Sequence, residues 1–125
     1  MTRALFLTGG RMNTLVCAGH AGFAEEGPDV LCAGISALTI ALDERLMALM
    51  AQRRLTAYRR VVKPGSVRLT AAGDGAVAEA FGTAAAGLSA LAKRYPACLQ
   101  CKRLERRPKH ERTHHPLAVR RGRGC

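Results

Sequence analysis

Two segments that resemble β-hairpins, each followed by a long segment with helical spacing of apolar residues, restrict the fold of this chain more than any other feature. Residues 3–8 and 12–18 are β-prone runs, and the glycines at positions 9 and 10 between them are a two-residue turn signal. From residue 30 apolar side chains recur every three or four positions, which predicts a helix ending near residues 53–54. They are Leu31, Ile35, Leu38, Leu42, Leu46 and Leu49.

The second half of the chain repeats this order. Residues 56–62 and 66–71 are β-prone around Lys63-Pro64-Gly65, and Asp74 is placed to cap a second helix that Pro96 stops. That helix has the apolar stripe Val77, Phe81, Ala84, Leu88, Leu91 and Tyr95. Strand, strand, helix, strand, strand, helix predicts an α/β fold, a two-layer sandwich with a mainly antiparallel sheet and two principal helices.

The length of 125 residues suits one compact domain, which we expect to span residues 1–101. Trp is absent and aromatics make up 4%, so the core must consist of Leu, Val, Ile, Met and Ala, and a second copy of the chain would enlarge it. Charges interrupt every apolar run well before 18 residues, so no transmembrane helix is expected. The apolar stretch at the N-terminus is too short for a signal peptide, which predicts a cytoplasmic protein.

Positive charge is concentrated at the C-terminus. Residues 1–101 carry 11 Lys and Arg against 7 Asp and Glu, whereas residues 102–125 carry 9 against 2. We interpret residues 102–125 as a basic, flexible extension, and an arginine–glycine stretch at 120–124 resembles segments that bind RNA with little sequence choice. A solvated extension without a function is the alternative interpretation.

Cys32 and His20 are the candidate catalytic residues. Asp29 stands at the expected N-cap, so Cys32 occupies the first turn of the helix, where unpaired amides and the helix dipole favour a thiolate. The same amides suit the oxyanion that forms when a thiolate attacks a carbonyl. The glycine-rich segment after His20 allows its imidazole to fold back onto the helix start. Buried structural cysteines are common in helices, however, so position alone does not decide between a catalytic and a structural role for Cys32.

The motif around these residues resembles the Prp (YsxB-like) ribosomal-processing cysteine proteases. It runs from Gly19-His20-Ala21 through a glycine-bearing loop to 27–38, Gly-Pro-Asp-Val-Leu-Cys-Ala-Gly-Ile-Ser-Ala-Leu. The family hallmark is Gly-His-Ala, a loop, and Gly-x-Asp, two apolar residues, Cys-Ala-x-x-Ser-Ala. A weaker likeness extends through the second helix, so that the resemblance covers roughly residues 1–101. The basic extension and the low acidic content depart from the family pattern.

The resemblance implies a cysteine endopeptidase that uses a Cys–His dyad without metal or organic cofactor. Cys32 would be the nucleophile and His20 the general base and acid, with supporting positions at Gly19, Asp29, Ala33 and Ser36. The substrate loop would contain Gly22, Phe23, Glu25, Glu26 and Gly27. Family members are similar in being homodimers that remove a short N-terminal extension from bacterial ribosomal protein L twenty-seven, cutting after an aromatic residue. The acidic pair 25–26 is either a solvated face or an attraction for a basic peptide.

The remaining cysteines and the basic tail suggest alternatives. Cys98 and Cys101 have a Cys-x₂-Cys spacing that, with His110, His114 and His115, supplies the ligand types of a zinc site, but the spacing is short and we interpret both cysteines as incidental, near a strand end. Cys17 falls in the apolar set of its strand and should belong to the core. The alternative function is a non-catalytic ribosome- or RNA-binding accessory protein that acts through its basic tail.

Overall fold

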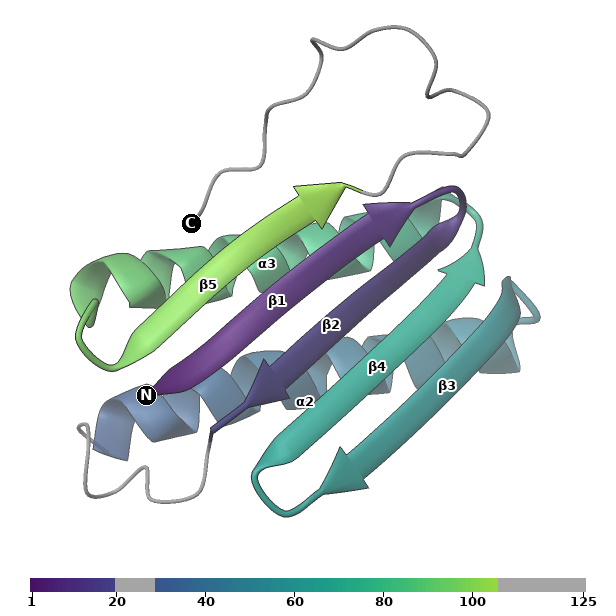
Figure 1. The fold of residues 1–125 in the computed structure, drawn as a ribbon. Coiled ribbons are helices and arrows are strands. Elements are labelled where there is room, and N and C mark those ends of the chain that lie inside the picture. The colour runs from purple at the N-terminus through teal and green to yellow at the C-terminus, as the bar shows by residue number, and fades with distance from the viewer. Residues whose placement is uncertain (20–28, 106–125) are drawn as a thin grey trace, which may run out of the picture.

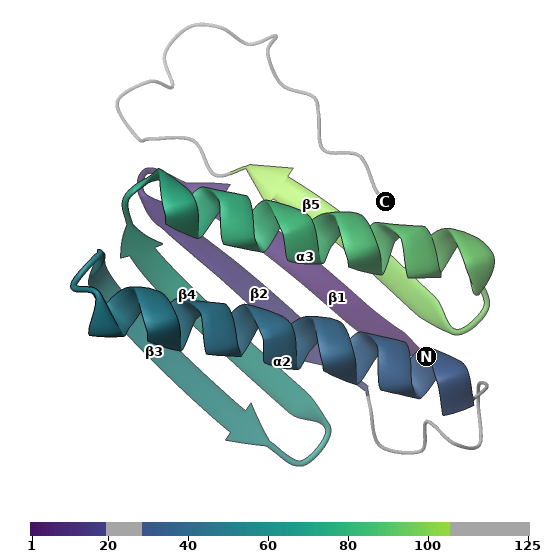
Figure 2. The same ribbon diagram turned by 180° about the vertical axis from the view of Figure 1, so that it is seen from behind.

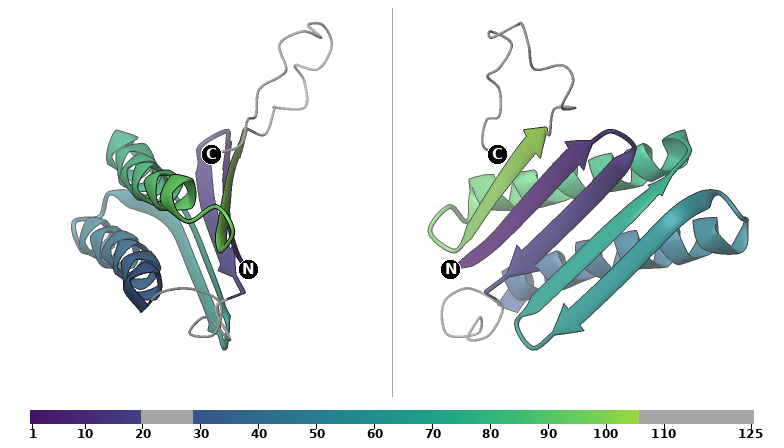
Figure 3. Two further views of the ribbon diagram at one scale, coloured as in Figure 1. Left: turned by 90° about the vertical axis from the view of Figure 1, so that its left-hand side faces the viewer. Right: turned by 45° about the vertical axis from the view of Figure 1, so that its right-hand side comes forward.

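The predicted two-layer α/β sandwich is confirmed. The computed structural model describes residues 1–19 and 29–105, and these form one five-stranded sheet with two helices. The strands are β1 (Thr2–Gly9), β2 (Met12–Ala18), β3 (Leu55–Lys63), β4 (Ser66–Gly73) and β5 (Leu99–Glu105). The helices are α2 (Asp29–Ala51) and α3 (Gly75–Arg94), and both lie on the same face of the sheet (Figures 1 and 3).

The sheet has the strand order β3-β4-β2-β1-β5. Pairing is antiparallel except between β5 and β1, which run parallel. Both predicted hairpins are present, with Gly9 paired to Met12 and Lys63 paired to Ser66. Gly10 at the first turn has a φ of 59° and Gly65 at the second has a φ of 77°, a conformation that glycine adopts without strain.

The core lies between the sheet and the helices. Alternate residues of the central strands point toward the helices, including Phe6 of β1, Leu15 of β2 and Leu69 of β4. The helices contribute the predicted stripes, and the buried helical residues are Leu31, Ile35, Leu42, Leu46, Leu49, Val77, Phe81, Ala84, Ala85, Leu88 and Ala92. With Trp absent, close packing depends on leucine and on small residues that let the layers approach.

Helix α2 ends at Ala51, two residues before the predicted basic pair. Arg53 has a φ of 61°, its amide donates to the carbonyl of Met50, and the amide of Arg54 donates to the carbonyl of Leu49. This is a Schellman closure with arginine in the left-handed position that glycine usually takes. The two arginines therefore follow the last turn instead of lying within it, and the chain reverses directly into β3.

The two antiparallel helices approach closely near the start of α2. A Cβ added at Gly34 would lie 3.1 Å from Leu91 of α3, and one added at Gly87 would lie 2.7 Å from the Leu38 side chain. Gly34 and Gly87 therefore let the two helices, which run side by side in Figure 2, pack closely. By length and composition α3 could cross a membrane, but its alanines supply much of that hydropathy and its largest apolar residues face the sheet.

Strand β5 was not predicted from the sequence. Only Leu99 and Cys101 of this strand are buried, and the following residues are exposed and mostly charged. Charged edge strands are common because they discourage pairing with other chains, but they give no alternating apolar signal. The strand crosses the boundary predicted after residue 101. The predicted flexibility of the rest of the extension falls on 106–125, outside the described residues.

Candidate active site

The topology brings the end of β2 and the beginning of α2 to the same end of the sandwich. β2 finishes at Ala18 and α2 begins at Asp29, and Figures 1 and 2 show both at the end where β1 starts. The turn between β3 and β4 lies there too, because the Gly19 amide donates to the Gly65 carbonyl at 2.9 Å. The residues that flank the predicted His20–Cys32 pair in sequence are therefore close in space.

Cys32 lies in the first described turn of α2, and its side chain is half-buried. It packs beside the buried Leu31 and Ile35 against the core, so that the helix axis and the sheet fix its backbone. A cysteine in a helix's first turn experiences the positive end of the helix dipole, which favours the thiolate. The arrangement is suited to a nucleophile that attacks a peptide carbonyl beside backbone amides.

Gly19 fixes the backbone where it enters the segment that begins with His20. Its φ of 96° favours glycine, and a Cβ there would lie 2.6 Å from the Met1 carbonyl oxygen and 3.2 Å from Thr2 Cα. The Thr2 hydroxyl donates to the Gly19 carbonyl at 3.4 Å, and the Thr2 amide donates to the Cys98 carbonyl. Two separate parts of the chain, residues 1–2 and the turn at Gly65, thus contact Gly19, and the Cys98 carbonyl in turn holds Thr2.

Several predicted site residues fall outside the described part of the chain: His20, Gly22, Phe23, Glu25, Glu26 and Gly27. Asp29 was predicted as the N-cap, but it is the first residue of α2 as described, and only its backbone position is described. Helix boundaries vary by a residue or two between assignments, so Cys32 remains in the first turn. The roles of these residues stay predictions.

Ala33 and Ser36 are exposed on α2, one and four residues after Cys32. Residues four apart lie one turn above each other, so Ser36 follows Cys32 along the same side of the helix. Gly34 between them faces Leu91, which brings α3 against the same turn. The structure therefore places three of the predicted supporting positions, Gly19, Ala33 and Ser36, at the end of the sandwich that carries Cys32.

The other cysteines occupy different surroundings. Cys17 is fully buried in β2, as predicted, and burial raises the pKa of its thiol to about 11. Cys98 is half-buried just before β5, whereas Cys101 is buried within β5, its sulfur 3.7 Å from the Ser89 hydroxyl. The interpretation of Cys98 and Cys101 as incidental stays a prediction, because the three histidines of the zinc alternative lie outside the described residues.

Sequence reasoning did not identify the contribution of Thr2 and Gly65. Neither belongs to the motif, and their contacts with Gly19 arise only from strand pairing. A separate apolar groove of about 410 Å³ opens between α2 and α3, lined by residues that include Ala41, Arg45, Ala76 and Ala80. Cys32 and Gly19 do not line it, so we do not assign it to the site.

Comparisons with known proteins identify the family. The family model for the cysteine protease Prp matches residues 1–100. A comparison with curated proteins finds no significant match.

Among solved structures, that of SMU.848 from Streptococcus mutans superposes with a TM-score of 0.65 at 23% identity, covering 85% of this chain and 96% of that one. Prp from S. aureus, described as an essential ribosomal processing protease, appears with a covalently linked product peptide, with a TM-score of 0.64 at 18% identity, covering 82% of this chain and 99% of that one. A complex of the same protease with a substrate peptide gives 0.61 at 17% identity and the same coverage. These likenesses establish the fold, and the family match, which spans most of the chain, establishes that this protein belongs to the Prp family of cysteine proteases.

Proposed function

We propose that this protein is a ribosomal-processing endopeptidase that removes a short N-terminal extension from ribosomal protein L twenty-seven, with Cys32 as nucleophile and His20 as base. The observation that carries the proposal is the position of Cys32 in the first described turn of α2, in a chain of the Prp family. The description of the S. aureus relative as a ribosomal processing protease supports the substrate class.

The chemistry proceeds through a thioester. His20 takes the proton of the Cys32 thiol, and the thiolate attacks the carbonyl carbon of the scissile peptide bond. Amides at the start of α2 stabilise the oxyanion of the tetrahedral intermediate. His20 then donates its proton to the leaving amine as the carbon–nitrogen bond breaks. A water molecule, deprotonated by His20, hydrolyses the thioester and restores the thiol.

The anchoring of Gly19 supports a precise entry into the segment with His20. A catalytic pair contributes only if its groups are held close to the productive geometry. Thr2, Gly65 and the Met1 carbonyl surround Gly19, so the last described residue before His20 has a fixed place at the end of the sheet. Cys32 is fixed at the same end by the packing of α2.

The proposal includes a homodimer that works in the cytoplasm. Exposed apolar side chains along α2 support an association of this kind, because Ile40, Met47 and Met50 are 60%, 45% and 46% exposed. The basic tail would add a weak contact with RNA near the substrate. The alternative in which this tail acts in a protein without catalysis does not agree with membership of a cysteine protease family.

Cleavage of a peptide that carries the extension of the host's ribosomal protein tests the assignment. We expect Cys32→Ala to lower the rate at least about a thousandfold while the melting temperature stays close to that of the wild type. His20→Gln should lower it similarly. Cys98→Ala is the matched control, since Cys98 is also half-buried, and it should cleave normally. Cleavage by Cys32→Ala at the wild-type rate would refute the proposal.

A further inference from the structure

The sheet has one face that no described element covers. Both helices pack on the opposite face, as Figure 3 shows from the side, and the uncovered face is toward the viewer in Figure 1. Because side chains alternate along a strand, the residues of this face follow from the buried set. In β1 and β2 the residues of this face are those between the buried ones, which are Ala4 and Phe6 in β1 and Leu15 and Cys17 in β2. We call this surface the open face.

The strand registers align the open face into rows that cross all five strands. One row contains Gln100, Arg3, Ala18, Ser66 and Lys63, and the next contains Lys102, Leu5, Val16, Arg68 and Val61. A third row contains Leu104, Leu7, Thr14, Thr70 and Arg59. The hydroxyls of Thr14 and Thr70 are 3.2 Å apart, which agrees with side chains that point to the same side.

The charges in these rows have one sign. Five exposed basic residues lie on the open face: Arg3, Arg59, Lys63, Arg68 and Lys102. The rows contain no Asp or Glu. Within residues 1–19 and 29–105, the ion pairs join Arg54 to Asp74 and Arg60 to Asp43, so none of the five basic groups of the open face is neutralised there.

The described carboxylates are on the other side of the molecule. Asp43, Glu44 and Glu79 belong to the helices, and Asp74 caps α3. Glu105 is paired with Thr8, which is next to Leu7 in β1 and therefore on the side of the sheet opposite the open face. The separation of charges makes the open face a cationic surface about 19 Å across, from the spacing of neighbouring strands.

We propose that the open face binds single-stranded RNA through its phosphates. Three of its five cations are arginines, whose guanidinium groups bind phosphate oxygens in a bidentate manner, and the two row-forming threonines add hydroxyl groups. Half-buried Leu5, Leu7 and Val16 lie in the central strands of the same rows and provide apolar surface beside the cations. The rows contain no Trp, Tyr or Phe for base stacking, so binding should show little sequence preference.

Other occupants fit this surface less well. A second copy placed face to face would set cations against cations. Binding in a membrane surface needs apolar side chains that insert into the lipid, whereas Leu5, Leu7 and Val16 of these rows are already half-buried in the sheet. The choice of RNA over DNA rests on the proposed function, because a ribosomal substrate is found with RNA, whereas the charge argument does not depend on that function.

The test compares two triple variants of the full chain that remove the same charge. The open-face variant carries Arg59→Gln, Arg68→Gln and Lys102→Gln, and the control carries Arg45→Gln, Lys93→Gln and Arg94→Gln in the helices. Fluorescence anisotropy of a short labelled oligouridine, measured over a salt series, gives the affinity. We expect a loss of about tenfold or more for the open-face variant and a salt slope smaller by about 2, since each phosphate contact on a single strand contributes about 0.7.

Equal losses in the two variants, or an unchanged affinity in the open-face variant, would overturn the proposal. So would tighter binding of oligothymidine, of vesicles containing phosphatidylserine or of polyglutamate. Peptide cleavage is measured on the same samples and should be retained in both variants. A wild-type protein that binds RNA through the open face but leaves the peptide intact would count against the proposed function alone.

Discussion

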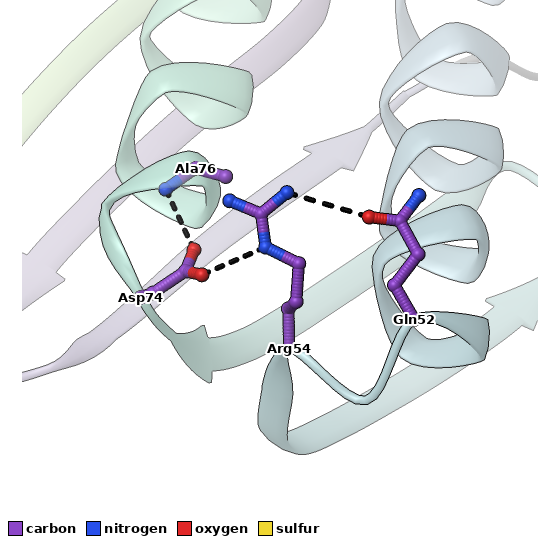
Figure 4. A network of polar contacts seen from close by, with 4 residues as sticks. All are labelled: Gln52, Arg54, Asp74 and Ala76. Atoms are coloured by element: carbon purple, nitrogen blue, oxygen red, sulfur yellow. Dashed lines mark hydrogen bonds and ion pairs between the residues drawn. The ribbon is translucent and has the colours of Figure 1, made fainter.

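The two ends of the sandwich each carry the start of one helix, and they use it differently. At one end Asp74 caps α3: its carboxylate accepts from the Ala76 amide at 2.9 Å and from Arg54 Nε at 2.8 Å, while Arg54 also donates to Gln52 (Figure 4). At the other end the first described turn of α2 carries Cys32. One helix start is closed by a carboxylate, and the other presents a thiol.

The carboxylate at the start of α3 stabilises the fold, whereas the thiol at the start of α2 is placed for chemistry. The positive end of a helix stabilises any anion placed there, whether it is a capping carboxylate or a thiolate. The capped end uses this effect to join the end of α2 to the start of α3. We infer that the site end uses the same effect to lower the pKa of a nucleophile. Disturbing the two ends should therefore have different consequences.

The largest contrast should appear in thiol reactivity. We expect the alkylation of Cys32 by iodoacetamide to have a pH midpoint below that of an ordinary cysteine, because of its place in the first turn of α2. Burial raises the pKa of Cys17 from 9.0 to about 11, which alone lowers its thiolate fraction about a hundredfold at neutral pH. Mass spectrometry of digested protein measures both rates. A Cys32 that titrates like a free thiol would contradict the comparison.

Glycine substitutions should show the next largest effect, because each end of the sandwich has a glycine whose neighbouring backbone leaves no space for a Cβ. At Gly73 a Cβ would lie 2.4 Å from the Arg54 carbonyl oxygen and 3.1 Å from Leu55 Cα. At Gly19 it would lie 2.6 Å from the Met1 carbonyl oxygen. We expect either alanine substitution to lower the free energy of unfolding by about 3 kcal/mol. Urea unfolding measures this change.

The two substitutions should differ in activity. Gly19→Ala displaces the backbone that leads into His20, so peptide cleavage should fall at a temperature where the variant is folded. Gly73→Ala should retain cleavage under the same conditions. Gly10→Ala is the control, since Gly10 has a φ of 59° and nothing lies within 4 Å of an added Cβ. Its loss of stability should be about 1 kcal/mol. Normal cleavage by Gly19→Ala would show that the anchor is not needed.

The sequence predicted these two ends to different degrees. The cap at Asp74 was correct, because an acidic residue before an apolar helical stripe is a local signal. The position of Cys32 in the first turn was also correct, although the helix begins at Asp29 instead of after it. Both signals involve residues that are near each other in the chain, so a pattern can report them.

Contacts between distant segments could not be predicted in this way. The anchoring of Gly19 by Thr2 and Gly65 depends on strand order and register, which no local pattern specifies. Strand β5 was missed for a related reason: it joins the sheet by pairing with β1, and only Leu99 and Cys101 in it are buried. The single sign of charge on the open face likewise emerges only when five strands are aligned.

The smallest effect should come from the capped end. The pKa of Asp74 is held below its usual range by the hydrogen bond from Arg54 and then by that from the Ala76 amide. A carboxylate with a lowered pKa contributes stability above its unfolded pKa and loses it as the pH falls through its folded pKa. We therefore expect Asp74→Ala to lower the melting temperature by a few degrees at neutral pH, with normal cleavage, and this difference should shrink below about pH 4.

Thermal unfolding followed by circular dichroism across this pH range measures the difference in melting temperature, with Glu79→Ala as an exposed control on the same helix. A difference that stays constant with pH would mean that the charge of Asp74 does not stabilise α3, and an accompanying loss of cleavage would mean that the two ends are not separate.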